Sequence, residues 1–249
     1  MIYAVVNQKG GVGKTTTSVN LGASLALLDK RVLLVDIDSQ ANASSGLGIV
    51  QASLTMADVI LDGRPIADIV VPTRIEGLFV APSGQDLAGA AVELPGRPER
   101  EFVLRRALEE VRGSYDIIIL DCPPSLDLIT VNALVGADRL IVPVQCEFYA
   151  LEGLSRLLET ITAVQASLNP GLRVTGMLMT MHDPRTRISA EVIGEVRKHF
   201  GELAFRAVIP RNVRLAEAPS HGEPVIRYDA ASSGAVAYSQ VAREVLQRD

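Results

Sequence analysis

The sequence has few aromatic residues, only two cysteines and no tryptophan. Because aromatics make up 4% of the 249 residues, an apolar core has to consist mainly of Val, Leu, Ile and Ala. This composition favours parallel strands covered by helices over an all-β sandwich. Cys122 and Cys146 are too few for a disulfide framework, so we expect two reduced thiols in a cytosolic protein.

Long apolar runs and an excess of positive charge are also missing. No run reaches the ~18 residues that a membrane-spanning helix needs, and the apolar residues 1–6 lack the basic start and cleavage site of a signal peptide. We therefore expect a cytoplasmic protein. The net charge of −5 argues against a strongly basic nucleic-acid binder but leaves room for a local basic face.

Apolar segments of strand length alternate with helical patterns along the whole chain. The predicted strands are 2–7, 31–36, 77–81, 115–121, 139–144, 173–180 and 206–209, and the predicted helices are 15–28, 98–111, 151–168, 190–200 and 235–249. This alternation predicts an α/β fold with a single doubly wound, mostly parallel sheet and helices on both faces. We expect one domain over residues 1–249. In the proline-rich region 51–100, a turn over 94–98 places Pro98 at the first position of a helix.

A glycine-rich segment, Asn-Gln-Lys-Gly-Gly-Val-Gly-Lys-Thr-Thr, connects the first strand to the first helix. Its glycines let backbone N–H groups turn toward an anion, and the helix N-terminus adds a positive dipole end. In the pattern G-x-x-x-x-G-K-[ST] the lysine reaches phosphates and the hydroxyl binds Mg²⁺. Gln8 replaces the first Gly of that pattern, and Lys9 adds a second lysine. The expected phosphate-binding residues are Lys9, Gly10, Gly11, Val12, Gly13, Lys14, Thr15 and Thr16.

Acidic residues end two more predicted strands. Asp36 and Asp38 follow the apolar residues 33–35, and their side chains point the same way if the strand continues. Asp121 ends the apolar run 117–120 and precedes two prolines that stiffen the next loop. Together with the phosphate loop, this pattern predicts that Asp121 binds Mg²⁺ through water and holds the Thr15 hydroxyl. A fourth motif covers residues 208–222.

These four motifs resemble the ParA/Soj family of partition ATPases, which belongs to the P-loop NTPases with a deviant Walker A sequence. MinD and the nitrogenase iron protein belong to the same class, and the resemblance covers nearly the whole chain. It implies a slow, Mg²⁺-dependent ATPase that forms an ATP-sandwich homodimer and binds double-stranded DNA non-specifically. It further implies chromosome or plasmid partition with a ParB-like stimulatory partner.

The resemblance also assigns roles to residues outside the glycines. It implies that Lys9 crosses the dimer interface to the partner's phosphates and acts in catalysis with Lys14 and Asp38, where Asp38 positions or activates the attacking water. It implies that Asp36 supports the Mg²⁺ shell. The positions that match Pro210 and Asn212 contact adenine in the family.

Three positions show where the chain departs from its relatives or excludes one of them. Ser39 stands where the family usually has Pro, which affects the rigidity of that loop. Leu128 stands where the nitrogenase iron protein supplies a cluster ligand, so we expect no iron–sulfur cluster and a packing role for Cys122. We interpret His221 as a structural loop residue.

The DNA prediction depends on the C-terminal part of the chain. Residues 181–249 carry ten Lys and Arg against nine Asp and Glu, whereas the preceding part is acidic. Arg185 and Arg214 match family positions implicated in DNA contact, but Glu223, Ala231 and Ser233 replace residues that tend to be basic in relatives. We expect weak, salt-sensitive binding that places the protein on the nucleoid.

The alternative is a MinD-like, nucleotide-gated positioning ATPase that acts at a membrane or protein scaffold without DNA. A membrane role needs a basic amphipathic terminal helix with large apolar residues. The last residues, 241–249, carry charges of both signs and no aromatic residue. We therefore expect this end to pack against the domain and predict no membrane binding.

Overall fold

Seven strands form one sheet in the computed structural model, which describes residues 1–147 and 152–248. The strands are β1 (Ile2–Val5), β2 (Val32–Asp36), β3 (Val71–Pro72), β4 (Leu78–Ala81), β5 (Ile117–Asp121), β6 (Arg139–Gln145) and β7 (Arg173–Thr180). Their order is β3-β4-β2-β5-β1-β6-β7, and only β3 runs antiparallel to its neighbour. The predicted doubly wound, mostly parallel sheet is confirmed.

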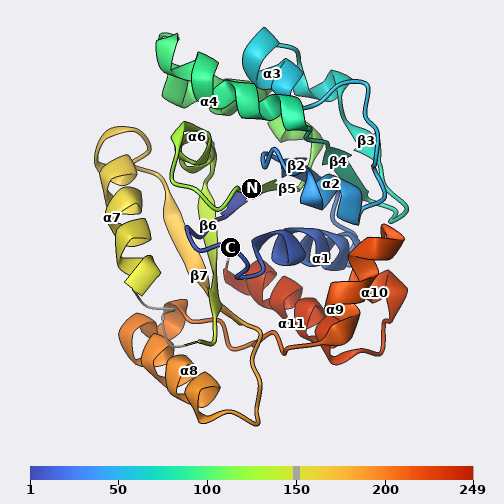
Figure 1. Cartoon of the computed structure of the whole chain (residues 1–249), viewed down its shortest axis with the longest axis vertical. Helices are drawn as coiled ribbons and strands as arrows, with labels where there is room; N and C mark the ends of the chain where they lie inside the picture. Colours follow the sequence, from blue (N-terminus) through green and yellow to red (C-terminus); the bar gives the residue numbers. More distant parts are fainter. Residues whose placement is uncertain (148–151, 249) are drawn as a thin grey trace.

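Helices cover both faces of this sheet. One face carries α1 (Lys14–Ala26), α10 (Val225–Tyr228) and α11 (Ser233–Arg248), and the other carries α3 (Met56–Asp62), α5 (Val103–Val111), α6 (Leu128–Gly136), α7 (Glu152–Ser167) and α8 (Arg187–Phe200). Figure 1 shows α1 and α11 on one side of the sheet and α6 and α7 on the other. The short helices are α2 (Asn42–Gly46), α4 (Ala90–Glu93) and α9 (Val213–Glu217).

The strand sequences explain this double cover. In β1, Ile2 and Ala4 belong to one apolar core, and Tyr3 and Val5 belong to the core on the opposite face. Successive side chains of a strand point to opposite faces, so an uninterrupted apolar strand requires helices on both.

The predicted strand at 206–209 is wrong. The backbone N–H groups of Phe205 and Ile209 donate to Met177 and Met179 on the edge strand β7, but the segment between them does not form a continuous ladder. Only isolated bridges flank it, at Ala204 and Pro210, and the latter residue has no N–H to extend the pairing.

Other predicted elements need correction as well. Pro98 does not start a helix, because it lies in a turn before a 3₁₀ segment, Arg100–Phe102, and α5 begins at Val103. Helix α6 was not predicted because its apolar residues are spread around the helix and leave no polar face. It starts where the Asp127 carboxylate accepts hydrogen bonds from the N–H groups of Ile129 and Thr130. Leu151, the expected start of α7, and Asp249 lie outside the described residues.

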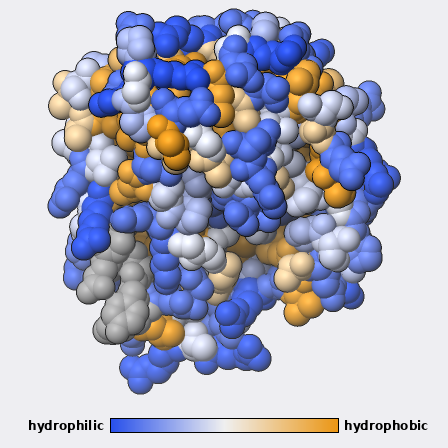
Figure 2. Space-filling model, turned by 45° about the horizontal axis from the view of Figure 1, so that its top comes forward, coloured by the Kyte–Doolittle hydropathy of each residue, from blue (hydrophilic) through white to orange (hydrophobic). Residues whose placement is uncertain are grey.

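The C-terminal helix packs against the domain, as predicted. The Tyr238 hydroxyl on α11 lies 3.1 Å from the Thr17 hydroxyl on α1, and Val241 and Val245 are buried. In the part of the chain that the structure describes, no helix is long and apolar enough to cross a membrane. The face shown in Figure 2 is mostly hydrophilic, with apolar groups in small separate patches.

The two cysteines are buried and unpaired, which confirms the expected free thiols and the packing role of Cys122. Burial raises the pKa of both thiols, that of Cys146 to about 11. Neither thiol is therefore an activated nucleophile at neutral pH.

Candidate functional site

The glycine-rich loop lies at the carboxyl end of β1 and leads directly into α1. Gly11 and Gly13 have φ angles of +73° and +89°, in the region that favours glycine. Gly13 is the N-cap of α1, and no side chain caps this helix. The N–H groups of the first turn are therefore left for an anionic ligand.

Residues from two distant strands hold the loop in place. The Asn7 amide donates to the Pro143 carbonyl in β6 at 2.7 Å, and its oxygen accepts from the Lys9 N–H at 3.0 Å. The Thr180 hydroxyl at the end of β7 donates to the Val12 carbonyl at 2.8 Å. The sequence carries no signal for these roles of Asn7 and Thr180, since their partners are far away along the chain or belong to the backbone.

The two loop lysines lie in different environments. Lys14 is 6% exposed and donates to the Lys9 carbonyl at 3.2 Å, and among the described residues it makes no ion pair. Burial lowers the pKa of Lys14, although the nearby carboxylates, Asp121 above all, counteract this. The Lys9 ammonium is partly exposed and lies 3.6 Å from the Glu147 carboxylate.

The predicted Thr15–Asp121 hydrogen bond is present. The Thr15 hydroxyl donates to Asp121 Oδ2 at 2.8 Å, and Ser18, one turn further along α1, donates to Oδ1 at 2.7 Å. Asp121 on β5 is the direct register neighbour of Asp36 on β2. The sheet thus places two buried carboxylates side by side next to the start of α1.

Asp36 and Asp38 do not point the same way along one strand, because β2 ends at Asp36. Asp36 Oδ2 accepts hydrogen bonds from the Ser44 N–H and hydroxyl at 2.8 and 2.7 Å. Asp38 is 8% exposed, and its Oδ1 accepts from the Gln40 N–H at 3.0 Å. Ser44, which the sequence analysis missed, is thus the main partner of Asp36.

Burial dominates the electrostatics of the two neighbouring carboxylates. It raises the pKa of Asp36 to about 6 and, together with the charge of Asp36, that of Asp121 to about 7, although hydrogen bonds from Ser44, Ser18 and Thr15 oppose the shift. Two buried anions side by side favour a bound cation. A hydroxyl beside carboxylates is an oxygen donor set that suits Mg²⁺.

Protein carboxylates alone do not complete a metal site here. Within residues 1–147 and 152–248, no three His, Cys, Asp or Glu side chains lie close enough to hold a metal ion. A cation beside Thr15 and Asp121 therefore needs further oxygens from a ligand or water, as Mg²⁺ in phosphate sites usually does.

A cavity of about 220 Å³ adjoins the phosphate loop. It shares Gly13 and Thr16 with the loop, and Pro210 and Asn212 line it as well. The remaining lining residues are Thr180, Met181, Ile209, Arg211, Leu215, Ala216 and Tyr238. The fold thus brings the fourth sequence motif next to the first, with a mostly apolar surface between them.

The Asn212 amide is engaged within the protein. Its oxygen accepts from the Arg214 N–H at 2.8 Å and caps α9, and its NH₂ group donates to the Ser233 hydroxyl at 2.7 Å. Pro210 has no N–H donor of its own. A contact between the Asn212 amide and a bound base therefore requires the exchange of one of these bonds.

The two arginines predicted to contact DNA are both exposed and both paired with acids. Arg185 donates to both carboxylate oxygens of Asp183 at 2.9 and 2.7 Å. Arg214 lies 2.8 Å from Glu217 and 3.3 Å from Asp229. These ion pairs reduce the positive charge that either residue offers to a phosphate.

His221, in the same region, stacks on Tyr228 with ring centroids 4.9 Å apart. This contact agrees with the structural role expected for the histidine.

Known proteins are similar to this chain over most or all of its length. A family model described as an AAA domain matches residues 1–174. The sporulation initiation inhibitor protein Soj of Bacillus subtilis is 55% identical over 98% of this chain and 97% of its own length. The chromosome partitioning protein ParA of Myxococcus xanthus is 51% identical over 100% of this chain and 88% of its own.

A similar solved structure contains a nucleotide. It is named cobyrinic acid a,c-diamide synthase from Mycobacterium smegmatis, with bound ATP analogue and magnesium. It is 38% identical, covers 99% of this chain and 94% of its own, and superposes with a TM-score of 0.87.

Proposed function

The chain belongs to the Soj/ParA family of chromosome-partitioning ATPases, and on this premise we propose that it binds and hydrolyses ATP with Mg²⁺ at residues 9–16. One observation carries the proposal: the phosphate loop and the apolar cavity share Gly13 and Thr16, so the triphosphate and the base of one nucleotide have adjoining sites. Pro210 and Asn212 are the proposed base contacts. The solved structure with an ATP analogue and magnesium supports this ligand.

The phosphate loop holds positively charged and N–H donor groups in place before the triphosphate binds. Lys14 is buried and makes no ion pair among the described residues, so no carboxylate has to be displaced, and only its hydrogen bond to the Lys9 carbonyl competes with the phosphates. The N–H groups of residues 10–16 line the same anion site. Lys9 lies at the more exposed side of the loop, where it exchanges Glu147 for the phosphates of a second protomer.

Thr15, Asp121 and Asp36 are the residues that hold Mg²⁺ in this proposal. When bound, Mg²⁺ would supply positive charge that offsets the charge developing on the phosphate oxygens. Thr15 offers its hydroxyl oxygen, Asp121 orients that hydroxyl, and Asp36 adds negative charge next to it.

Asp38 is the residue that orients and deprotonates the attacking water. Its Oδ1 already accepts from the Gln40 N–H, so the second carboxylate oxygen is the one available for water. Ser44 supports this geometry indirectly, because it fixes Asp36, whose Oδ1 accepts from the Asp38 N–H.

The proposed dimerisation, DNA binding and partner are based on the Soj/ParA family and on the charged residues of the C-terminal part. We propose an ATP-sandwich homodimer in the cytoplasm that binds double-stranded DNA of the nucleoid non-specifically and responds to a ParB-like partner. Since Arg185 and Arg214 have to leave acidic partners to reach DNA phosphates, we expect weak affinity that falls steeply with salt.

The test combines size and binding measurements on the same protein. Gel filtration with ATP and Mg²⁺ should show a dimer that is absent with ADP. Co-sedimentation with DNA at two salt concentrations should show ATP-dependent binding, and charge reversal of both Arg185 and Arg214 should weaken it by about tenfold. Binding to anionic vesicles instead of DNA would favour the positioning ATPase, and DNA binding unchanged in the double variant would exclude these arginines as contacts.

A further inference from the structure

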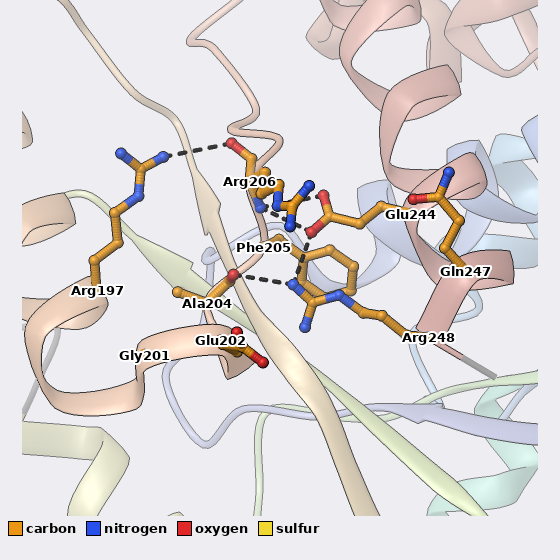
Figure 3. A pocket seen from close by; sticks show the side chains of 9 residues that line it. All are labelled: Arg197, Gly201, Glu202, Ala204, Phe205, Arg206, Glu244, Gln247 and Arg248. Carbon is orange, nitrogen blue, oxygen red and sulfur yellow. Dashed lines mark hydrogen bonds and ion pairs between the residues drawn. The ribbon is translucent and has the colours of Figure 1, made fainter.

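A cavity lined by three arginines lies away from the phosphate loop. This cavity of about 540 Å³ is formed by the end of α8, the following turn, the extended segment after it and the end of α11 (Figure 3). Its lining residues are Arg197, Gly201, Glu202, Ala204, Phe205, Arg206, Glu244, Gln247 and Arg248. We call it the arginine cleft.

The arginine cleft is separate from the proposed nucleotide site. Both cavities are lined by α11, but Tyr238 lines the nucleotide side and Glu244 is the first α11 residue that lines the arginine cleft. These two positions are six residues apart, which corresponds to about 9 Å along the helix axis. A ligand of the arginine cleft therefore does not occupy the phosphate loop.

One of the three arginines is used to build the cleft. The Arg248 guanidinium lies 4.4 Å from the centroid of the Phe205 ring and donates to the carbonyls of Thr175 and Ala204 at 2.9 and 3.0 Å. It also donates to Glu244 at 2.7 Å. Arg248 is therefore a wall of the cleft with few donors left for a ligand.

The negative charge of Glu244 is also compensated within the cleft wall. Its oxygens accept hydrogen bonds from the N–H groups of Arg206 and Ala207 and from Arg248. Burial acts to raise the pKa of Glu244, but these hydrogen bonds outweigh it and keep the pKa below its usual value. The carboxylate is thus committed to the cleft wall.

The other two arginines retain most of their donors. Among the residues that the structure describes, the Arg197 guanidinium donates only to the Arg206 carbonyl, at a long 3.4 Å. The Arg206 guanidinium has no hydrogen bond or ion pair among residues 1–147 and 152–248, since only its backbone is bonded. Glu202 on the same rim makes no ion pair among these residues and opposes part of this positive charge.

We propose that the arginine cleft binds a small phosphate-bearing anion, held mainly by Arg197 and Arg206. Guanidinium groups from two elements approach the cavity from different directions (Figure 3). A tetrahedral phosphate has acceptors in several directions and suits two separate forks, whereas one fork already satisfies a planar carboxylate. The volume falls in the range of small-ligand sites.

The experiment uses the full chain with Lys14→Ala, which removes phosphate binding at the loop. Inorganic phosphate and glycerol 3-phosphate are titrated by calorimetry at constant ionic strength, and the tighter probe distinguishes a free anion from a phosphate ester. We expect saturable binding that Arg206→Ala or Arg197→Ala weakens by about tenfold. Arg187→Ala is the matched control, since Arg187 lies on the same helix but does not line the cleft.

A second variant keeps the proposal falsifiable if an arginine variant is unstable. Glu202→Gln removes the opposing charge and should tighten phosphate binding by about two- to fivefold. The absence of saturable binding would overturn the proposal, as would equal losses in Arg206→Ala and Arg187→Ala or an unchanged affinity in Glu202→Gln. Because the background lacks the loop lysine, none of these results depends on ATP binding.

Discussion

Lys14 and Arg185 are both cations that the sequence assigns to phosphate groups, but the fold holds them in opposite ways. Lys14 is buried at the end of a rigid loop, and no acid within ion-pair distance neutralises it among the described residues. Arg185 is 84% exposed and bonded to both oxygens of Asp183. An enclosed cation is prepared for its ligand, whereas an exposed cation has to give up a partner first.

The difference predicts unequal sensitivity to mutation. Removing an enclosed charged group is costly, because the opposite charge that it binds is then left unpaired where the local dielectric constant is low. Removing an exposed group is partly compensated by solvent and salt.

Asp38→Ala tests the enclosed region most strongly. We expect kcat for ATP hydrolysis to fall by about 10²–10⁴-fold, because the carboxylate proposed to deprotonate the attacking water is lost. The ATP-bound dimer should persist in gel filtration. Asp68→Ala, which removes an exposed carboxylate paired with Arg64, is the control. Normal turnover in Asp38→Ala would show that another group activates the water.

Lys14→Ala should weaken ATP binding by at least about 100-fold, since a buried charge-assisted contact to the phosphates is lost. The measurement is titration with a fluorescent ATP analogue. Lys30→Ala removes another of the four lysines, outside the loop, and should bind ATP normally. Equal affinities in the two variants would break the contrast between enclosed and exposed cations.

Asp121→Asn tests how much the two buried carboxylates lower the stability of the folded protein. Because burial raises the pKa of Asp121 to about 7, the folded protein holds an extra proton between about pH 4 and pH 7. The stability of the metal-free protein should therefore fall as pH rises through this window. The variant lacks this loss and should gain about 1–3 kcal/mol at pH 8.

Urea unfolding at pH 5 and pH 8, with and without Mg²⁺ and ADP, measures this effect. Wild-type protein should recover stability at pH 8 when Mg²⁺ and nucleotide are added, and the variant should recover less. A pH dependence that is the same in both proteins would contradict the assigned burial cost.

Asp183→Asn tests the exposed region and should have the smallest effect. Arg185 loses its charged partner, so the DNA affinity of the ATP-bound protein should rise by about two- to fivefold. Asp68→Asn changes the net charge equally without touching Arg185. If both variants bind DNA equally well, the gain comes from overall charge and not from the release of Arg185.

Much of the candidate site could be predicted because its residues are contiguous in sequence. Residues 9–16 form one loop whose conformation depends on local glycines, so the pattern alone indicates a phosphate site. The Thr15–Asp121 bond could also be predicted, because the loop that leads to Thr15 follows the carboxyl end of one parallel strand and Asp121 ends another. Asp38 is less determined, since β2 ends before it.

The residues that support the site could not be predicted in the same way. Ser44 and Ser18 hold the two buried acids, and Asn7 and Thr180 hold the loop through backbone carbonyls. Ser and Thr occur throughout the chain, so their identity alone carries no signal. Their roles depend on which strands become neighbours.

The amino-acid order by itself determined the alternation of apolar strands and helices, and with it a parallel sheet whose strand ends carry glycines, lysines and acids. These properties depend on short-range periodicity and on local backbone freedom. The folded structure was needed to see that Asp36 and Asp121 are direct neighbours, that the Asn212 amide donates to the Ser233 hydroxyl, and which arginines make no ion pair among the described residues. Such outcomes depend on distances between segments that are far apart along the chain, and packing alone sets those distances.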